Sequence, residues 1–497
     1  MGLKAILSKP LSAILAWHIH YVRKNAVACQ QKVFATLIRT ASNTAFGRDH
    51  QFSLIATYED FKKRVPLADY EQLKPYIERI KSGEENILWP GKPIYLSKTS
   101  GTTSGTKFIP ITRESIHNHI NSARNALLMY IHETGNASFL DGKLLFLSGS
   151  PKLTAIQGIK TGRLSGIVNH HIPAYLQNNQ VPSLETNSIA DWEIKIEAIL
   201  TEILSSKLTL ISGIPPWVQM FFDSIGRRTG KTVQEVFPDL SVYVYGGVSY
   251  DPYRSRMENS MGANIETIET YPASEGFIAY QDSRKEAGML LVVDEGIFYE
   301  FIPLECIENP QEFRIGLSAV CCNTNYAIVL NTNAGLWGYI IGDTVKFTSI
   351  APYRLVVTGR ISHFISAFGE HVIAEEVDYA IRLVSEQMQV EIIEYTVAPQ
   401  VNPVGELPYH EWFVEFGKLP PDLEAYRVAV DTVLQSKNSY YKDLIQGGIL
   451  QPLKIKRMKK NSFISFMREE GKLGGQNKMP RLANNRDIAS KLVAYAY

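Results

Sequence analysis

Residues 97–107 read Ser-Lys-Thr-Ser-Gly-Thr-Thr-Ser-Gly-Thr-Lys and follow an apolar run at 93–96 that predicts a strand. A strand leading into a loop of hydroxyl side chains, glycines and lysines can offer backbone N–H groups, hydroxyls and ammonium groups to a polyphosphate. The spacing of Gly101, Gly105 and Lys107 does not fit the G-x-x-x-x-G-K-[ST] register of a Walker A loop. The same composition is also typical of a solvated Ser/Thr turn, so this stretch alone does not establish a phosphate site.

The composition indicates a soluble, multidomain protein. A chain of 497 residues is too long for one compact core and predicts two or three domains. Its 51 basic and 50 acidic residues give a formal net charge of +1, so no overall field favours nucleic acid or an anionic membrane. The 4 cysteines form no C-x-x-C motif and no disulfide framework, which favours a reducing, cytoplasmic compartment.

The N-terminal segment predicts an amphipathic helix that continues through residues 22–24. Lys4, Lys9 and Pro10 interrupt its apolar residues and no small-residue cleavage site follows, which argues against a signal peptide. No stretch of the chain approaches about 18 uninterrupted apolar residues, so no membrane span is expected.

The first two thirds of the chain predict an α/β fold. Helices are expected within 1–90 and over 113–133, where Thr112 is a plausible N-cap. Predicted strands at 143–148, 208–213, 242–245 and 265–271 then alternate with predicted helices at 189–205, 217–229 and 255–261. Strand–helix–strand repeats of this length imply parallel strands joined by right-handed crossovers.

The remaining third of the chain predicts a different pattern of secondary structure, in which strands follow one another directly. Residues 289–293 and 297–301 are expected to form a hairpin around the turn 294–296, followed by strands at 326–330, 336–347 and 353–358 in an attached antiparallel sheet. A small α+β tail follows, with helices at 374–387 and 421–436 and strands at 391–397, 412–416 and 453–458. With a hinge at 360–363, we expect a large α/β body at 1–361 and a smaller C-terminal domain at 362–497.

Two motifs follow the ends of predicted parallel strands, where open α/β sheets bind ligands. Gly246 and Gly247 expose backbone against which a flat ring can lie. Tyr271 can stack on a base, and the turn behind it carries Ser274 and Glu275, a carboxylate able to hold magnesium. An ordinary strand-ending turn and a solvated loop carboxylate are the alternative interpretations.

Three more residues are candidates for contacts with a ligand. Asp343 follows a glycine within a strand and can accept two hydrogen bonds from a ribose diol. Arg360 lies in a turn cluster at the hinge, and Lys478 lies on the glycine-rich loop 474–478. Taken singly, a Gly-Asp turn and a surface lysine are the more ordinary interpretations.

In their order along the chain, these motifs resemble those of the adenylate-forming enzymes. The resemblance is closest to the Gretchen Hagen-type (auxin-responsive promoter) acyl acid amido synthetases and their bacterial relatives, and it extends from about residue 95 to about residue 481. The stretch 99–107 is similar to the family's phosphate loop, with one residue fewer before Lys107. Residues 271–275 are similar to its Tyr-Ala-Ser-Ser-Glu motif, and 331–345 to the region of its Tyr-Arg-x-Gly-Asp motif, with Ile340 where arginine is usual.

The resemblance implies a role for each matching residue. The ATP phosphates would be held by Ser100, Gly101, Thr102, Thr103, Ser104 and Lys107. Gly246, Gly247 and Tyr271 would surround the adenine, and Asp343 and Arg360 would hold the ribose. Catalysis would involve Lys478 at the α-phosphate, Ser274 near the adenylate, and Glu275 as the magnesium ligand. We also expect helix 113–133 and segment 211–218 to line an acyl pocket, with Arg124 facing the acid and Trp217 in the wall.

The implied reaction is ATP- and magnesium-dependent activation of a carboxylic acid to acyl-AMP, followed by conjugation to an amino acid or other amine. Attack of a carboxylate on a phosphate brings two anions together, so magnesium and a lysine in a dry site are the expected means of neutralising charge. A ligase that forms a coenzyme A thioester and a non-catalytic nucleotide-binding regulator remain open as alternatives. The sequence predicts no nucleic-acid partner and leaves the substrates and the oligomeric state undetermined.

Overall fold

The computed structural model describes residues 2–100, 106–172, 174–189, 191–247, 250, 253–361, 364–365, 372–401, 403, 405–447, 449–474, 478–483 and 485–497. The chain divides into two compact units. The N-terminal unit comprises Met1–Val248, Asn264–Ile341 and Val345–Val356, and the C-terminal unit comprises Ser249–Ala263, Gly342–Thr344 and Val357–Tyr497. Residues 249–263 and 342–344 therefore pack with the C-terminal unit, although they precede the expected boundary at 361/362.

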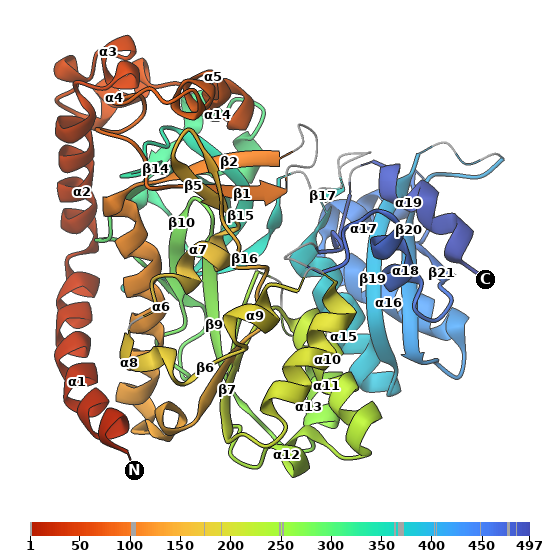
Figure 1. Ribbon diagram of the computed structural model, residues 1–497. Coiled ribbons are helices and arrows are strands. Elements are labelled where there is room, and N and C mark those ends of the chain that lie inside the picture. The colour runs from red at the N-terminus through yellow and green to blue at the C-terminus, as the bar shows by residue number, and fades with distance from the viewer. Residues whose placement is uncertain are drawn as a thin grey trace. The chain divides into compact units, whose positions relative to one another are not determined.

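Helices occupy most of the first 90 residues, as the sequence predicts. They are α1 (Leu3–Lys24), α2 (Ala26–Ala41), α3 (Ala45–Asp49), α4 (Tyr58–Arg64) and α5 (Tyr70–Lys81). Capping boxes built on Thr57 and Asp69 satisfy the first N–H groups of α4 and α5. Figure 1 shows α1 and α2 following one another along one side of the N-terminal unit, with α6 between α1 and the sheet. Within the described part of the chain, no helix has the length and apolarity needed to cross a bilayer.

Helix α6 (Arg113–Thr134) confirms the predicted long helix and its N-cap. The Thr112 hydroxyl accepts a hydrogen bond from the N–H of Ser115, and the helix ends at Gly135, whose φ of 70° is left-handed. The buried side chain of Asn118 fixes α6 to the sheet, because its amide donates to the carbonyl of Phe277 and its oxygen accepts from the N–H of the same residue.

One large sheet dominates the N-terminal unit. Its strand order is β13-β12-β14-β15-β16-β11-β10-β9-β8-β7-β3-β6. Strands β3 (Lys143–Phe146), β6 (Gln180–Val181), β7 (Leu208–Ser212), β8 (Val242–Gly246) and β9 (Glu266–Ala273) pair in parallel, as predicted. The predicted antiparallel part continues the same sheet and contains β10 (Gly276–Tyr280), β11 (Met289–Leu291), β12 (Ile297–Pro303), β13 (Ile315–Gly316), β14 (Asn325–Thr332), β15 (Tyr339–Ile350) and β16 (Tyr353–Arg360).

The predicted hairpin of 289–293 with 297–301 is wrong. Strand β11 lies between β16 and β10, whereas β12 lies between β13 and β14. The buried amide of Gln30 on α2 explains the difference, because it occupies the backbone groups at this turn. It donates to the carbonyls of Val293 and Ile297, and its oxygen accepts from the N–H of Tyr299. A side chain more than 260 positions away in the sequence thus replaces the local turn bonds.

A second, four-stranded sheet contains the two strands that flank the glycine-rich loop within residues 97–107. Its order is β2-β1-β5-β4, and its strands are β1 (Tyr95–Ser100), β2 (Thr106–Ile111), β4 (Thr154–Ile156) and β5 (Ile159–Gly162). The other helices of the unit are α7 (Leu164–Asn169), α8 (Ala174–Gln177), α9 (Leu184–Asn187), α10 (Trp192–Ile203), α11 (Pro215–Thr229), α12 (Val233–Val236) and α14 (Pro310–Phe313).

The C-terminal unit is a small α+β body, as predicted. Its three-stranded sheet has the order β19-β20-β21, formed by β19 (Glu391–Gln400), β20 (Tyr409–Lys418) and β21 (Lys454–Arg457). The remaining elements are α13 (Arg254–Met261), β17 (Phe364–Ile365), β18 (Val372–Ile373), α15 (Ala374–Met388), α16 (Leu423–Lys437), α17 (Ser439–Gln446), α18 (Ser462–Glu469) and α19 (Asp487–Leu492). Helices α15 and α16 pack apolar faces onto the sheet around the fully buried Trp412.

Candidate active site

The carboxyl ends of β8 and β9 bring the glycine pair and Tyr271 into one region of the N-terminal unit. Gly246 of β8 pairs with Thr270 of β9, and a Cβ at Gly246 would lie 2.3 Å from the Thr270 carbonyl oxygen. Gly247 has a φ of 77°, which an L side chain rarely adopts. The two glycines are therefore required by the local backbone, and Tyr271, next to Thr270, is buried in the main core.

Ser274 and Glu275 form the tip of the tight hairpin between β9 and β10. Both residues are half-buried. The hydroxyl of Ser97, on β1, donates to the hydroxyl of Ser274 at 3.1 Å, and Ser97 is fully buried. This bond joins the strand that leads into the glycine-rich loop to the turn that carries the candidate catalytic residues.

The glycine-rich loop itself connects β1 to β2, with Ser100 opposite Thr106 in the register. Gly101, Thr102, Thr103 and Ser104 lie outside the described residues, and for Ser100 only the backbone is described. Lys107 lies on β2 opposite Thr99, and its Nζ is 5.6 Å from the centre of the Tyr70 ring. The expected phosphate contacts of this loop stay a prediction.

Glu275 is the residue that the sequence assigns to magnesium. Among the described side chains, no group of three or more His, Cys, Asp or Glu residues could hold a metal ion. A single carboxylate fits magnesium only where substrate phosphates and waters supply the other oxygen ligands, which is how this ion is usually held in nucleotide-using enzymes. The half-buried carboxylate of Glu275, on the same turn as Ser274, is compatible with that arrangement.

In the C-terminal unit, Asp343 and Arg360 form an ion pair. Arg360 Nε lies 2.8 Å from Asp343 Oδ1, with the Asp343 side chain 19% exposed. The N–H of Ile361 donates to the carbonyl of Gly342, whose φ is 89°, and the hydroxyls of Thr344 and Thr358 lie 2.9 Å apart. The two predicted ribose-binding residues are thus held side by side on neighbouring strands.

Lys478 also belongs to the C-terminal unit. Lys478 is an exposed residue, yet loss of solvation at its ammonium lowers the pKa from 10.5 to about 8. The Asp343 carboxylate opposes this shift and the Arg360 guanidinium adds to it. Lys478 therefore lies within electrostatic reach of the predicted ribose pair.

A buried network, which the sequence did not reveal, fixes the segment that follows Lys478. Arg481 is bonded to the Glu394 carboxylate and the Tyr253 hydroxyl, and it donates to the carbonyl of Tyr395 at 3.2 Å. The Arg481 carbonyl in turn accepts from the N–H of Val397. Arg481 is thus a positioning residue for the Lys478 segment, and its sequence signal is only that it lies three positions after that lysine.

The two expected acyl-pocket residues lie apart from one another. Trp217 on α11 is buried against Trp192 of α10, with ring centroids 4.6 Å apart. Arg124 on α6 is bonded to the side chain of Asn125, and it lines a cavity of about 140 Å³ that lies beneath α1. Glu295 lines the same cavity, and burial raises the pKa of its carboxyl. The hydrogen bond from Asn121 and the charge of Arg124 oppose this rise only in part. An acyl role for either residue stays a prediction.

Comparison with known proteins identifies the family. The sequence matches the GH3 family N-terminal domain over residues 17–200, the central domain over 290–360 and the C-terminal domain over 375–487. The chain belongs to the GH3 family. This agrees with the resemblance that the sequence motifs carry.

This GH3-family protein is similar in sequence to curated enzymes and in fold to solved structures. Jasmonoyl–L-amino acid synthetase JAR4 of Nicotiana attenuata is 24% identical over 352 residues, which cover 58% of this chain and 60% of that protein. The chain thus spans about three fifths of the length of this curated relative. The structure of GH3.15 acyl acid amido synthetase matches with a TM-score of 0.81 at 17% identity, covering 98% of this chain and 96% of the other. That of 2-hydroxyisobutyryl-CoA ligase matches with a TM-score of 0.59 at 14% identity, covering 95% and 94%. These likenesses confirm the adenylate-forming fold.

Proposed function

We propose that this GH3-family protein is an ATP-dependent acyl acid amido synthetase. It would activate a carboxylic acid as acyl-AMP and then conjugate the acyl group to an amino acid or another amine. The observation that carries the proposal is the junction of β1, β8 and β9, where the Ser97–Ser274 hydrogen bond and the Gly246–Thr270 pairing bring three separated motifs together. A curated relative that matches by sequence is a jasmonoyl–L-amino acid synthetase.

In this proposal the N-terminal unit binds the nucleotide's base and phosphates. The exposed backbone at Gly247 and the buried Tyr271 would accommodate the adenine, and the loop 100–104 with Lys107 would hold the phosphates. Bound magnesium would neutralise phosphate charge, with Glu275 as its protein ligand. Ser274, held by Ser97, would stand near the reacting carboxylate.

The C-terminal unit would contribute Asp343 and Arg360 to the ribose and Lys478 to the α-phosphate. Arg360 Nε lies 2.8 Å from Asp343 Oδ1, so a carboxylate and a guanidinium stand together where the proposal places the ribose diol. A lysine with a pKa of about 8 is still mostly protonated at neutral pH and can stabilise negative charge that develops on the phosphate. A cytoplasmic location, which the cysteine spacing predicts, suits an enzyme that consumes ATP.

The test is a two-stage assay on the full chain. A panel of carboxylic acids is first screened with ATP and magnesium for pyrophosphate release. The active acid is then incubated with ATP and either a mixture of amino acids or coenzyme A, and the product is identified by mass. An amide supports the proposal. A thioester, or no pyrophosphate release with any acid, contradicts it.

A further inference from the structure

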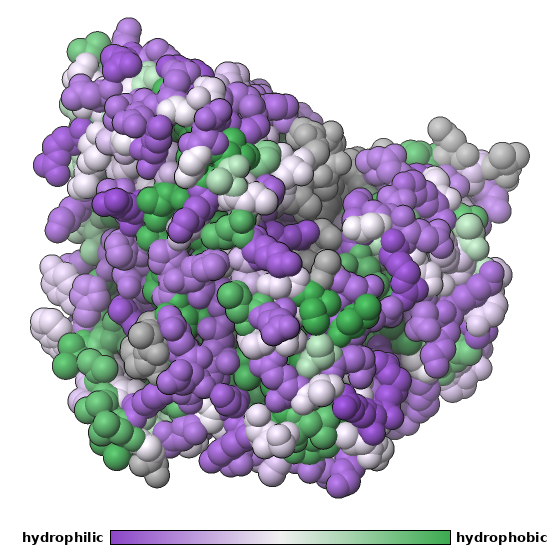
Figure 2. Space-filling view, in the orientation of Figure 1, coloured by the Kyte–Doolittle hydropathy of each residue, from purple (hydrophilic) through white to green (hydrophobic). Residues whose placement is uncertain are grey.

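Helix α1 turns its most hydrophobic residues toward solvent. Six residues spaced three or four positions apart form one stripe along the helix, and each is between 54% and 74% exposed. They are Leu3, Leu7, Leu11, Ile14, Trp17 and Tyr21. Spacing of this kind places them on one face over the whole length of α1. Figure 2 shows hydrophobic residues gathered over the N-terminal part of this helix. We refer to these six residues as the α1 stripe.

In its first half, the inward face of α1 carries only small side chains. The buried residues of the helix are Ala5, Ser8, Ser12, Ile19 and Val22. The hydroxyls of both serines are satisfied by carbonyls of the helix itself. A surface helix of a soluble protein normally places its apolar side on the core and its polar side in water. Over the first half of α1 the side that contacts water is the more hydrophobic, so the core does not explain Leu3, Leu7, Leu11 and Ile14.

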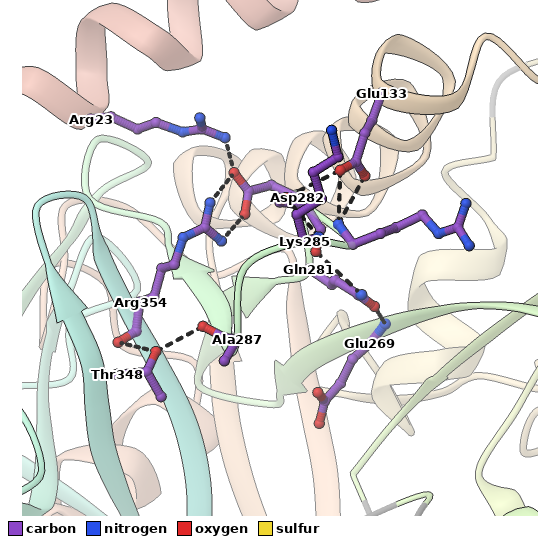
Figure 3. Close-up of polar contacts among 11 residues, drawn as sticks. Arg23, Glu133, Glu269, Gln281, Asp282, Lys285, Ala287, Thr348 and Arg354 are labelled. Atoms are coloured by element: carbon purple, nitrogen blue, oxygen red, sulfur yellow. Dashed lines mark hydrogen bonds and ion pairs between the residues drawn. The ribbon is translucent and has the colours of Figure 1, made fainter.

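Polar contacts hold α1 in this orientation. The N–H of Gly2 donates to Asp141 at 2.7 Å, the Lys4 ammonium is bonded to Asn179, and His18 lies 3.2 Å from Asp294. At the other end Arg23 reaches the fully buried Asp282, which Arg354 of β16 also binds (Figure 3). These anchors at both ends prevent α1 from rolling to bury its stripe.

Helices α1 and α2 carry charged side chains of one sign only. Residues 1–48 contain seven lysines and arginines and no aspartate or glutamate, a formal charge of +7. Because the whole chain carries +1, residues 49–497 carry −6. Lys9, His20 and Lys24 are exposed along one edge of the stripe. Salt limits the reach of charge to about 8 Å at physiological ionic strength, so the basic residues of α1 itself, Lys4, Lys9, Arg23 and Lys24, matter most for what approaches it.

We propose that α1 is a docking face for an anionic lipid bilayer and lies parallel to the membrane surface. Its stripe would enter the boundary between headgroups and acyl chains, with Trp17 and Tyr21 at the headgroup level, where such rings are enriched. The neighbouring lysines and arginines would be attracted to anionic headgroups. A second copy of the chain fits less well, because two such helices would bring only positive charges together.

Trp17 provides a direct reporter. The protein has 6 tryptophans, and the other five (Trp89, Trp192, Trp217, Trp337 and Trp412) are at most 7% exposed, whereas Trp17 is 74% exposed. Quenching of fluorescence by iodide therefore reports mainly on Trp17. With vesicles of phosphatidylcholine and phosphatidylglycerol, we expect a blue shift of the emission and loss of iodide quenching. Vesicles of phosphatidylcholine alone should give neither, and Trp17→Phe should abolish both changes.

Matched variants of the full chain test the stripe by vesicle co-sedimentation. Leu7→Gln, Leu11→Gln and Ile14→Gln combined should lower the partition coefficient by at least about tenfold. The control combines Leu54→Gln, Leu184→Gln and Ile194→Gln, at residues that are equally exposed elsewhere in the N-terminal unit, and should bind as the parent does. Lys9→Glu with Lys24→Glu should also weaken binding, whereas Lys231→Glu with Lys285→Glu should not.

Three results would overturn the proposal. The first is absence of binding to anionic vesicles. The second is equal loss of binding in the stripe variant and its control while circular dichroism shows both folded. The third is a lipid-free dimer that shields Trp17 from iodide and that the stripe variant converts to a monomer, which would make the stripe an interface between copies. None of these results depends on the proposed ligase activity.

Discussion

The hydroxyl of Ser97 lies 3.1 Å from the hydroxyl of Ser274, although the two residues are 177 positions apart in the sequence. Ser97 belongs to the four-stranded sheet and Ser274 to the hairpin of the large sheet. The bond therefore holds two separately folded motifs of the candidate site in one register. Ser97 itself is fully buried.

Ser97→Ala should reduce the rate of acid-dependent ATP–pyrophosphate exchange by about tenfold, because Ser274 loses the bond that orients it. The free energy of unfolding should fall by only about 1 kcal/mol. Ser8→Ala is the matched control, since Ser8 is also buried and its hydroxyl is also bonded at 2.9 Å, but on α1. Equal exchange rates in the two variants would show that the Ser97–Ser274 bond has no catalytic consequence.

Gly246→Ala should destabilise the protein by about 1–3 kcal/mol and weaken ATP binding, because the added Cβ meets backbone that cannot yield easily. The new atom would lie 2.3 Å from the Thr270 carbonyl oxygen. Gly226→Ala on α11 is the control, as nothing lies within 4 Å of its Cβ position, and it should stabilise the helix by up to about 1 kcal/mol. Chemical unfolding and calorimetric titration with ATP measure the two effects. Wild-type stability of Gly246→Ala would mean that β8 and β9 can separate without cost.

Lys478→Ala should lower adenylation by orders of magnitude and leave the affinity for ATP nearly unchanged, because its charge is needed as the reaction proceeds. The pKa of about 8 adds a pH signature. Adenylation should decline as the pH rises through 8 and the ammonium loses its proton. Lys478→Arg should abolish that decline, since arginine stays charged. The exposed Lys472→Ala should retain the wild-type rate and profile. An unchanged rate in Lys478→Ala would refute its assignment.

His119 should make the protein acid-sensitive. It is buried on α6, its Nδ1 has no hydrogen-bond partner among the described residues, and burial lowers its pKa from 6.5 to about 4. The unfolded chain therefore takes up a proton below pH 6.5 that the folded chain does not, so stability present above pH 6.5 is lost as the pH falls toward 4. The loss from this one group is at most about 3 kcal/mol.

The contribution of His119 appears as a difference between variants. Unfolding of the wild type and of His119→Leu is compared at pH 7 and pH 4.5, and the variant should lose less stability on acidification. The exposed His132→Leu on the same helix should behave as the wild type. If His119→Leu loses as much as the wild type, the histidine must be able to charge in the folded state.

The elements of this fold were predictable where local patterns determine them. Helix α6 begins at the N-cap that Thr112 supplies, and the parallel strands β7, β8 and β9 lie at the predicted apolar runs. The pairing of β11 and β12 was not predictable from 289–301, because the amide of Gln30 on α2 takes the backbone groups of that turn. Local sequence specifies that a strand forms, whereas a distant side chain decides its neighbour.

The candidate site was likewise predictable only where its residues are adjacent in the sequence. The motifs at 246–247, 271–275 and 343 could be recognised because each is a short run of consecutive residues. The positioning role of Arg481 was not predictable, because its partners Glu394, Tyr253 and Tyr395 are distant from it in the sequence. The amphipathic nature of α1 was readable from its sequence, but which face meets water was not.

For this protein the amino-acid sequence alone determined the family and the α/β class, since ordered motifs and periodic apolar residues are local properties. Only the tertiary structure decided that Ser97 holds Ser274, that Arg481 anchors the segment behind Lys478, and that α1 exposes its apolar side. Each of these depends on contacts between residues far apart in the chain. Such contacts form only when packing brings the elements together, and no local pattern encodes the partner.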